Sequence, residues 1–197
     1  MGVSETPARQ RMIETAGRLF AGRGYAATSM RGIVEAAKAP WGSVHHYFPG
    51  GKEQIGLAAI ELGDQLVRAS LVACLEQAST PAEAVSLWFD VAARNLKAGD
   101  FEVGCPVATV ALETASDANA MGTACATSFA GWRSLLAKAF RDTGVPAKRA
   151  RELATVVVTN FEGALLLSRV SRSTEPLRLA AETVAGVLDA ELAPSAR

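Results

Sequence analysis

The sequence predicts an all-α fold of nine helices joined by short connections, and three observations support this prediction. Of its 197 residues, 49% are hydrophobic and 20% are charged, a composition typical of a folded globular protein. Alanine and leucine dominate, and apolar residues recur three and four positions apart, as on one face of a helix. Valine, isoleucine and threonine never alternate with polar residues between hairpin turns, so no strand is expected.

The first three helices are predicted within the first fifty residues. Pro7–Arg23 places its apolar residues on one face, and Gly24 follows its end. Thr28-Ser29 begins a short second helix that continues to about Ala36. Pro40 suits the first position of a third short helix, which ends near His46 because the following Phe48–Gly51 segment turns the chain.

Six further helices are predicted in the rest of the chain. The clearest start is Thr80-Pro81-Ala82-Glu83, a capping box with proline at the first helical position. The expected ranges are about Lys52–Gln77, Thr80–Lys97, Cys105–Glu113, Asp117–Arg141, Ala147–Val170 and Ser173–Leu192. We therefore predict a domain of three helices over residues 7–56 and a helical body over residues 57–194.

Charge is unevenly distributed although the formal net charge is zero. Residues 1–55 carry seven lysines and arginines against four acids, and the rest of the chain carries thirteen against sixteen. Both histidines, His45 and His46, also lie in the basic part. This asymmetry suits a small module that faces phosphates, attached to a body with another task.

Patterns typical of metal, cofactor or catalytic sites are missing from the sequence. Cys74, Cys105 and Cys125 are widely spaced and fit neither a metal site nor an even-numbered disulfide framework. Gly51-Lys52 is followed by Glu53 and lacks the other residues of a phosphate-binding loop. We expect no metal, no cofactor and no catalytic residue, and keep a redox role for Cys105 or Cys125, or a helical enzyme, as alternatives.

The most apolar run, Leu153–Leu167, is about fifteen residues long and is interrupted by Asn160 and Glu162. A helix that crosses a membrane needs roughly 20 apolar residues. The first thirty residues contain four arginines and no continuous apolar stretch, so no secretory signal is expected. We predict a buried helix, no membrane partner, and a reducing, cytoplasmic setting.

The layout of the first three helices predicts a helix-turn-helix unit, whose third helix would enter the major groove of DNA. Val44 and Phe48 lie four apart and are expected to anchor this segment beside Ile33 and Phe20. The side chains left facing outward carry hydroxyls, imidazoles, aromatic rings and a cation, which suit contacts to phosphates and bases. They are Lys38, Trp41, Ser43, His45, His46 and Tyr47. An ordinary helical hairpin with buried aromatics stays open on spacing alone.

The residues Gly24–Ile33 and Ala39–Glu53 resemble, in order, the N-terminal domain of the tetracycline-repressor (TetR) family. The Phe48–Lys52 turn and the segment Gly104–Glu113 resemble the LmrA/YxaF-like subgroup, whose members regulate drug-resistance or flavonoid-degradation genes. The resemblance implies a TetR-like architecture in which three helices bind DNA and six serve ligand binding and dimerisation. It also implies a repressor that a small effector releases from a palindromic operator.

By this resemblance, Thr28 caps the second helix and contacts phosphate, Pro40, Gly42 and Ser43 lie at the groove, and Lys52 reaches a phosphate. Trp41 and His45 replace the family's usual polar residue and tyrosine, so the operator should differ from those of close relatives. The complete DNA-binding set that we predict is Thr28, Ser29, Lys38, Pro40, Trp41, Gly42, Ser43, His45, His46, Tyr47 and Lys52.

Aromatic and polar side chains of the body could together line a cavity for a largely apolar or aromatic effector, although core packing explains each one singly. The predicted effector set is Trp88, Phe89, Cys105, Pro106, Thr109, Phe129, Trp132, Phe161 and Leu165. The segments Leu153–Leu167 and Leu177–Leu192 contain more apolar and small residues than one buried face needs, which predicts a homodimer through these two helices. The predicted dimer set is Ala154, Val157, Val158, Phe161, Ala164, Leu165 and Ser168.

Overall fold

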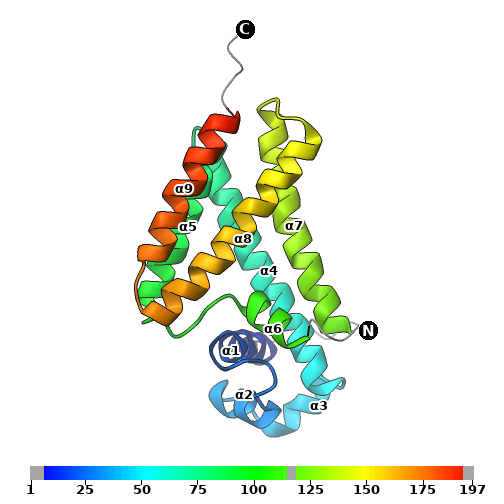
Figure 1. Ribbon diagram of the computed structural model, residues 1–197. Helices are drawn as coiled ribbons and strands as arrows, with labels where there is room; N and C mark the ends of the chain where they lie inside the picture. Colours follow the sequence, from blue (N-terminus) through cyan, green and yellow to red (C-terminus); the bar gives the residue numbers. More distant parts are fainter. Residues whose placement is uncertain (1–6, 115–118, 193–197) are drawn as a thin grey trace. The chain divides into compact units, whose positions relative to one another are not determined.

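The computed structural model describes residues 7–114 and 119–192, and within them it contains nine α-helices, one 3-10 turn and no strand (Figure 1). The elements are α1 (Pro7–Arg23), α2 (Met30–Ala36), η1 (Trp41–Ser43), α3 (Val44–Tyr47), α4 (Gly51–Gln77), α5 (Pro81–Ala98), α6 (Pro106–Thr114), α7 (Ala120–Asp142), α8 (Ala147–Ser171) and α9 (Glu175–Leu192). The predicted all-α fold of nine helices is confirmed. Two predicted boundaries, the helix start at Asp117 and the domain end at residue 194, lie outside the described residues.

The chain forms two compact units that do not follow the order of the sequence. The first contains the described residues up to Gln65 together with Cys105–Ser128, and the second contains Leu66–Gly104 together with the described residues from Phe129 onward. The helix α6 belongs to the first unit because it packs against α1. This grouping differs from the predicted division after residue 56, which assumed that each domain is one continuous stretch.

The core of the first unit forms around the apolar face of α1. Met12 and Phe20 on this helix are buried, and so is Ile33 on α2. Val44 and Phe48 are also buried, so the predicted anchoring of the third helix is confirmed. Because these two side chains point inward at a spacing of four, the residues between them face outward.

In the second unit α5, α8 and α9 pack against one another (Figure 1). The predicted capping box at the start of α5 is confirmed: Thr80 Oγ1 accepts a hydrogen bond from the Glu83 amide at 3.1 Å. The Glu83 carboxylate in turn accepts one from the Ser79 amide at 2.9 Å. Arg149 on α8 bonds to Glu191 on α9 and to Glu152 one turn along its own helix.

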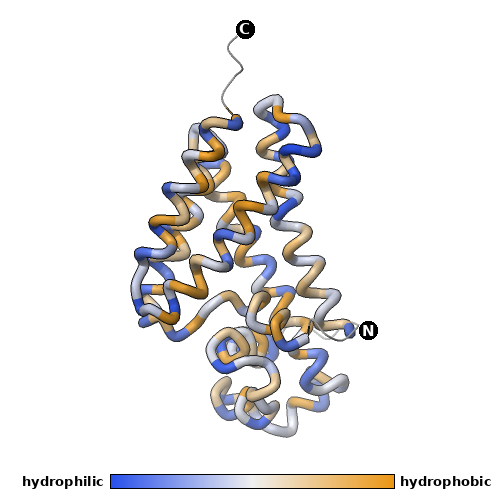
Figure 2. The backbone as a smooth tube through the Cα atoms, viewed as in Figure 1, coloured by the Kyte–Doolittle hydropathy of each residue, from blue (hydrophilic) through white to orange (hydrophobic). Residues whose placement is uncertain are grey.

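The helix α8 has two apolar faces. Hydrophobic residues recur along this helix (Figure 2). Those of one face are buried, and α8 packs against α5 and α9. The other face exposes Val156, Leu166, Leu167 and Val170. Among the described helices, only α8 is long and apolar enough to cross a membrane by length and composition. The core helix of a protein outside the membrane can meet the same two criteria.

Candidate nucleic-acid interface

The predicted recognition segment adopts a tight turn followed by two short helical pieces. Lys38 has a left-handed backbone (φ 49°) that redirects the chain after α2. The predicted third helix is divided into the 3-10 turn η1 and the α-helical turn α3. The Ser43 amide and hydroxyl both donate to the Pro40 carbonyl, at 3.0 and 2.6 Å, and this fixes the start of η1.

Most side chains predicted to contact DNA are accessible. Trp41, a residue type that is usually well buried, has 54% of its surface exposed. His45 and His46 are exposed, and Tyr47 is half-buried with its ring edge-on to His46 at 5.0 Å. The remaining exposed members of the set are Ser29, Lys38, Pro40 and Gly42, and the remaining half-buried ones are Ser43 and Lys52.

Thr28 does not cap α2, which corrects the role that the family resemblance implied. Ser29 has the extended backbone of an N-cap, and its hydroxyl accepts a hydrogen bond from the Gly32 amide at 3.0 Å. Thr28 is buried, and its hydroxyl donates to the Gly24 carbonyl at 2.7 Å. Serine and threonine can both cap a helix, and the backbone geometry decides which of two adjacent ones does so.

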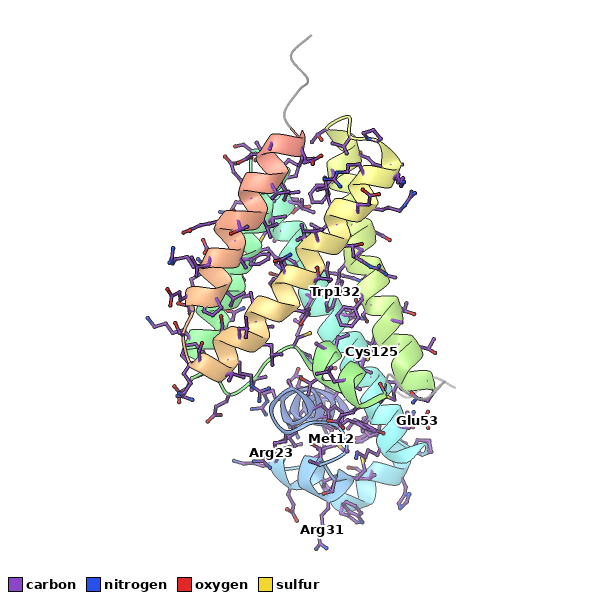
Figure 3. All side chains as sticks on the ribbon, in the orientation of Figure 1. Met12, Arg23, Arg31, Glu53, Cys125 and Trp132 are labelled. Atoms are coloured by element: carbon purple, nitrogen blue, oxygen red, sulfur yellow. The ribbon has the colours of Figure 1, made fainter. Side chains whose placement is uncertain are left out.

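Sequence reasoning missed Arg31, which extends away from α2 (Figure 3). This side chain lines a groove of about 540 Å³ together with Lys38 and Trp41. Its guanidinium forms an exposed ion pair with Glu35 at 3.3 Å. A cation one helix before the recognition segment is the signal that could have identified it, since phosphate contacts come from several elements of a DNA-binding unit.

The Lys52 ammonium points toward the turn that follows α1. It donates to the Ala26 carbonyl at 3.3 Å and lies 4.3 Å from the centre of the Tyr25 ring. Burial lowers the pKa of Lys52, and the nearby Glu113 carboxylate opposes this shift. The structure therefore gives Lys52 a local partner, while its predicted contact to a DNA phosphate stays a prediction.

Comparisons with known proteins agree with this geometry. Residues 12–59 match the family model described as bacterial regulatory proteins, tetR family, and residues 81–183 match the LmrA/YxaF-like C-terminal domain of transcriptional regulators. The chain is 31% identical to the HTH-type transcriptional regulator YxaF of Bacillus subtilis (strain 168), over 92% of this chain and 95% of that protein. The HTH-type transcriptional regulator LmrA of the same strain is also 31% identical, over 86% and 90%.

The chain belongs to the TetR family of bacterial transcriptional regulators. It is a DNA-binding regulator and not an enzyme. A solved structure of the regulatory protein TetR from Rhodobacter sphaeroides shares the fold, with a TM-score of 0.84 and 24% identity over 92% of this chain and 98% of that one.

The predicted effector residues of this TetR-family chain divide between the two units. Cys105, Pro106 and Thr109 lie at the start of α6 in the first unit. In the second unit Trp88 and Phe161 stack with ring centres 3.7 Å apart, and Phe89 meets Phe161 edge-on at 5.2 Å. These three rings form a packed, buried cluster. Phe129 and Trp132 form a second edge-on pair at 5.1 Å, and Leu165 is half-buried.

Most of the predicted dimer residues lie inside the single subunit. The side chains of Ala154, Val157, Val158, Phe161, Ala164 and Ser168 are buried within the chain itself, and Leu165 is half-buried. The Ser168 hydroxyl also accepts a hydrogen bond from the Leu177 amide at 3.2 Å, which joins α8 to α9. The sequence predicted one wide apolar stripe on α8, and in the single subunit the exposed apolar residues of this helix are instead Val156, Leu166, Leu167 and Val170.

Cys74, Cys105 and Cys125 are buried, and none of the three forms a disulfide. Burial raises the pKa of Cys125 to about 11 and also raises that of Cys74, so both thiols are held in the protonated, less reactive form. Cys105 lies just before α6, and its sulfur accepts a hydrogen bond from the Ala108 amide at 3.4 Å. These environments argue against the redox alternative for Cys125.

Proposed function

We propose that this TetR-family regulator is a ligand-responsive repressor, a homodimer that binds a palindromic operator and is released by a small effector. The observation that carries the proposal is the exposed side of η1 and α3, where Trp41, His45 and His46 stand free of the core while Val44 and Phe48 fix the segment below them. Aromatic and imidazole groups held in this way match contacts to thymine methyls, base edges and phosphates. The repressor role itself rests on the family resemblance.

The exposed face of α8 and α9 supports the homodimer. Leu166, Leu167 and Val170 on α8 and Leu179 and Val187 on α9 are all exposed. A groove of about 550 Å³ between these helices is lined by Gly163, Leu167 and Leu179, among others. A C2 dimer through this face would present two recognition segments to successive major grooves, roughly 34–36 Å apart, and it would require a palindromic operator.

The effector is proposed to be largely apolar or aromatic, with one or two hydrogen-bonding groups. The support is the aromatic content of the body, which includes Trp88, Phe89, Phe161 and Trp132. The effector needs to bind the DNA-free conformation more tightly than the DNA-bound one by only about 1–3 kcal/mol to change the occupancy of the operator severalfold or more. We also propose that the protein acts in the cytoplasm, where its operator lies.

The test is a fluorescence anisotropy titration with the DNA that flanks the protein's own gene. The affinity should fall steeply as salt rises, because phosphate contacts release counterions. Trp41→Ala should weaken specific binding by about fivefold to a hundredfold, as expected for one lost base contact. Leu66→Ala is the matched control, because Leu66 is also a large exposed apolar residue (63%) but lies on α4.

Two results would overturn the proposal. One is a complex that is indifferent to salt, and the other is a Trp41→Ala variant that binds as tightly as Leu66→Ala. The same assay tests the effector class, since a library of aromatic compounds should contain one that releases the DNA. A small, highly charged metabolite as the effective ligand would contradict the proposed class.

A further inference from the structure

The turn at Gly24–Ala26, between α1 and α2, is held by a side chain that lies far away in the sequence. The Glu113 carboxylate, near the end of α6, accepts hydrogen bonds from two successive backbone amides. Its Oε1 accepts from the Tyr25 amide at 2.9 Å and its Oε2 from the Ala26 amide at 2.6 Å. Such bonds to a charged acceptor are stronger than those between neutral groups.

Gly24 makes room for this contact. Its backbone is left-handed (φ 90°), a conformation that glycine adopts without strain. A Cβ atom at this position would overlap the Glu113 carboxylate. The turn and the acidic side chain are therefore fitted to each other, and any other residue at position 24 would disturb both.

The Tyr25 side chain ties the same turn to other helices of the first unit. Its ring lies 5.2 Å from that of Phe20 on α1 and under the Lys52 ammonium of α4. It packs so closely on Gly56 of α4 that a Cβ there would come within 3.0 Å of the ring and 2.7 Å of Met121 on α7. Burial raises the pKa of Tyr25, and the nearby Glu53 adds to this shift.

The turn leads directly into the residues that start α2. The Thr28 hydroxyl donates to the Gly24 carbonyl, and the Thr28 amide donates to the Tyr25 carbonyl at 3.2 Å. The next residue, Ser29, caps α2. The position of the turn thus determines where α2 begins, and α2 carries Arg31 beside the recognition segment.

We infer that Glu113 is a positioning residue for DNA binding, which fixes the turn Gly24–Ala26 and through it the start of α2. The hydrogen-bond partners of Glu113 are backbone amides of the turn and not residues of the recognition segment, although its charge also acts on Lys52. Because Glu113 is exposed overall, water can replace part of what its carboxylate supplies. Its loss should therefore loosen the turn without unfolding the chain. The inference rests on DNA binding by the N-terminal helices.

The experiment compares Glu113→Gln with Glu61→Gln, a matched control on α4. Glu61 is exposed on the surface of α4, and both changes remove one negative charge. Removing a negative charge should by itself raise the affinity for DNA slightly, and this is the result expected for Glu61→Gln. Glu113→Gln should instead bind specific DNA about tenfold more weakly, because an amide has one oxygen for two backbone donors and turns its own N–H toward the other.

Two further measurements separate positioning from general stability. Amide hydrogen exchange at Tyr25 and Ala26 should accelerate in Glu113→Gln and in Glu113→Ala, while the amides of α8 keep their rates. Binding to an unrelated duplex should match that of Glu61→Gln, since phosphate attraction does not need the exact start of α2.

The inference fails if hydrogen exchange at the turn is unchanged in Glu113→Gln. It also fails if this variant loses affinity for specific and for unrelated DNA by the same factor and its Tm falls as well. A wild-type protein without any specific DNA complex would instead contradict the proposed operator recognition. In that case hydrogen exchange alone would still decide whether Glu113 holds the turn.

Discussion

At the scale of single residues, Lys38 combines two roles that can be separated by mutation. Its left-handed backbone costs roughly 1–2 kcal/mol for a residue with a Cβ, and its ammonium is a predicted DNA contact. Lys38→Gly should raise the free energy of unfolding by about 1 kcal/mol because the strain is relieved. The same variant should weaken DNA binding because a cation is lost, as urea unfolding and anisotropy would show.

The control for this prediction is Lys38→Ala, which loses the cation but keeps the Cβ. It should weaken DNA binding as much as Lys38→Gly without the gain in stability. Equal unfolding free energies for the two variants would contradict the strain argument, and unchanged DNA binding of Lys38→Ala would contradict the contact.

Residues also show where sequence reasoning succeeds and where it stops. Val44 and Phe48 could be assigned to the core because a spacing of four places two apolar side chains on one helical face. Glu113 could not be linked to the turn, because its partner Tyr25 is 88 positions away and no local pattern records such a contact. Thr28 and Ser29 could not be distinguished, because both residue types cap helices.

At the scale of helices, α5 was predicted best because its start signal is entirely local. Thr80, Pro81 and Glu83 supply the cap, the first residue and the returning carboxylate within four positions. The helix α8 was harder, because both of its faces are apolar and periodicity does not say which face looks inward. The inward face became identifiable only from its packing against α5 and α9.

The cap of α5 gives a prediction at this scale. Thr80→Ala should lower the free energy of unfolding by about 1 kcal/mol, because the Glu83 amide loses its acceptor. Thr127→Ala on α7 is the matched control, since the Thr127 hydroxyl is exposed and only donates to a carbonyl of its own helix. Denaturant unfolding measures both, and equal values for the two variants would contradict a capping role.

At the scale of the whole molecule, the zero net charge conceals a division that suits DNA binding. The basic first 55 residues can approach phosphates, and the acidic remainder is repelled by them. The fold of a single subunit also leaves Trp41 of the recognition segment exposed. It leaves one large apolar surface uncovered, the outer face of α8 and α9, and soluble monomers rarely expose such a surface without a partner.

The dimer is therefore the decisive prediction for the intact molecule. Leu167→Arg places a charge on the outer face of α8, where burying it against a second copy would be costly. The variant should be monomeric by sedimentation at micromolar concentration. Its affinity for a palindromic operator should fall by a hundredfold or more, on the order expected when two half-sites no longer bind together.

Leu66→Arg is the control, because Leu66 and Leu167 are almost equally exposed (63% and 61%) and the charge change is the same. Leu66 lies on α4, outside the proposed interface, so this variant should stay dimeric and bind the operator as the wild type does. A Leu167→Arg protein that remains dimeric would place the interface elsewhere. A monomeric variant that binds the operator without loss would show that one recognition segment is sufficient, and the palindrome would then lose its physical reason.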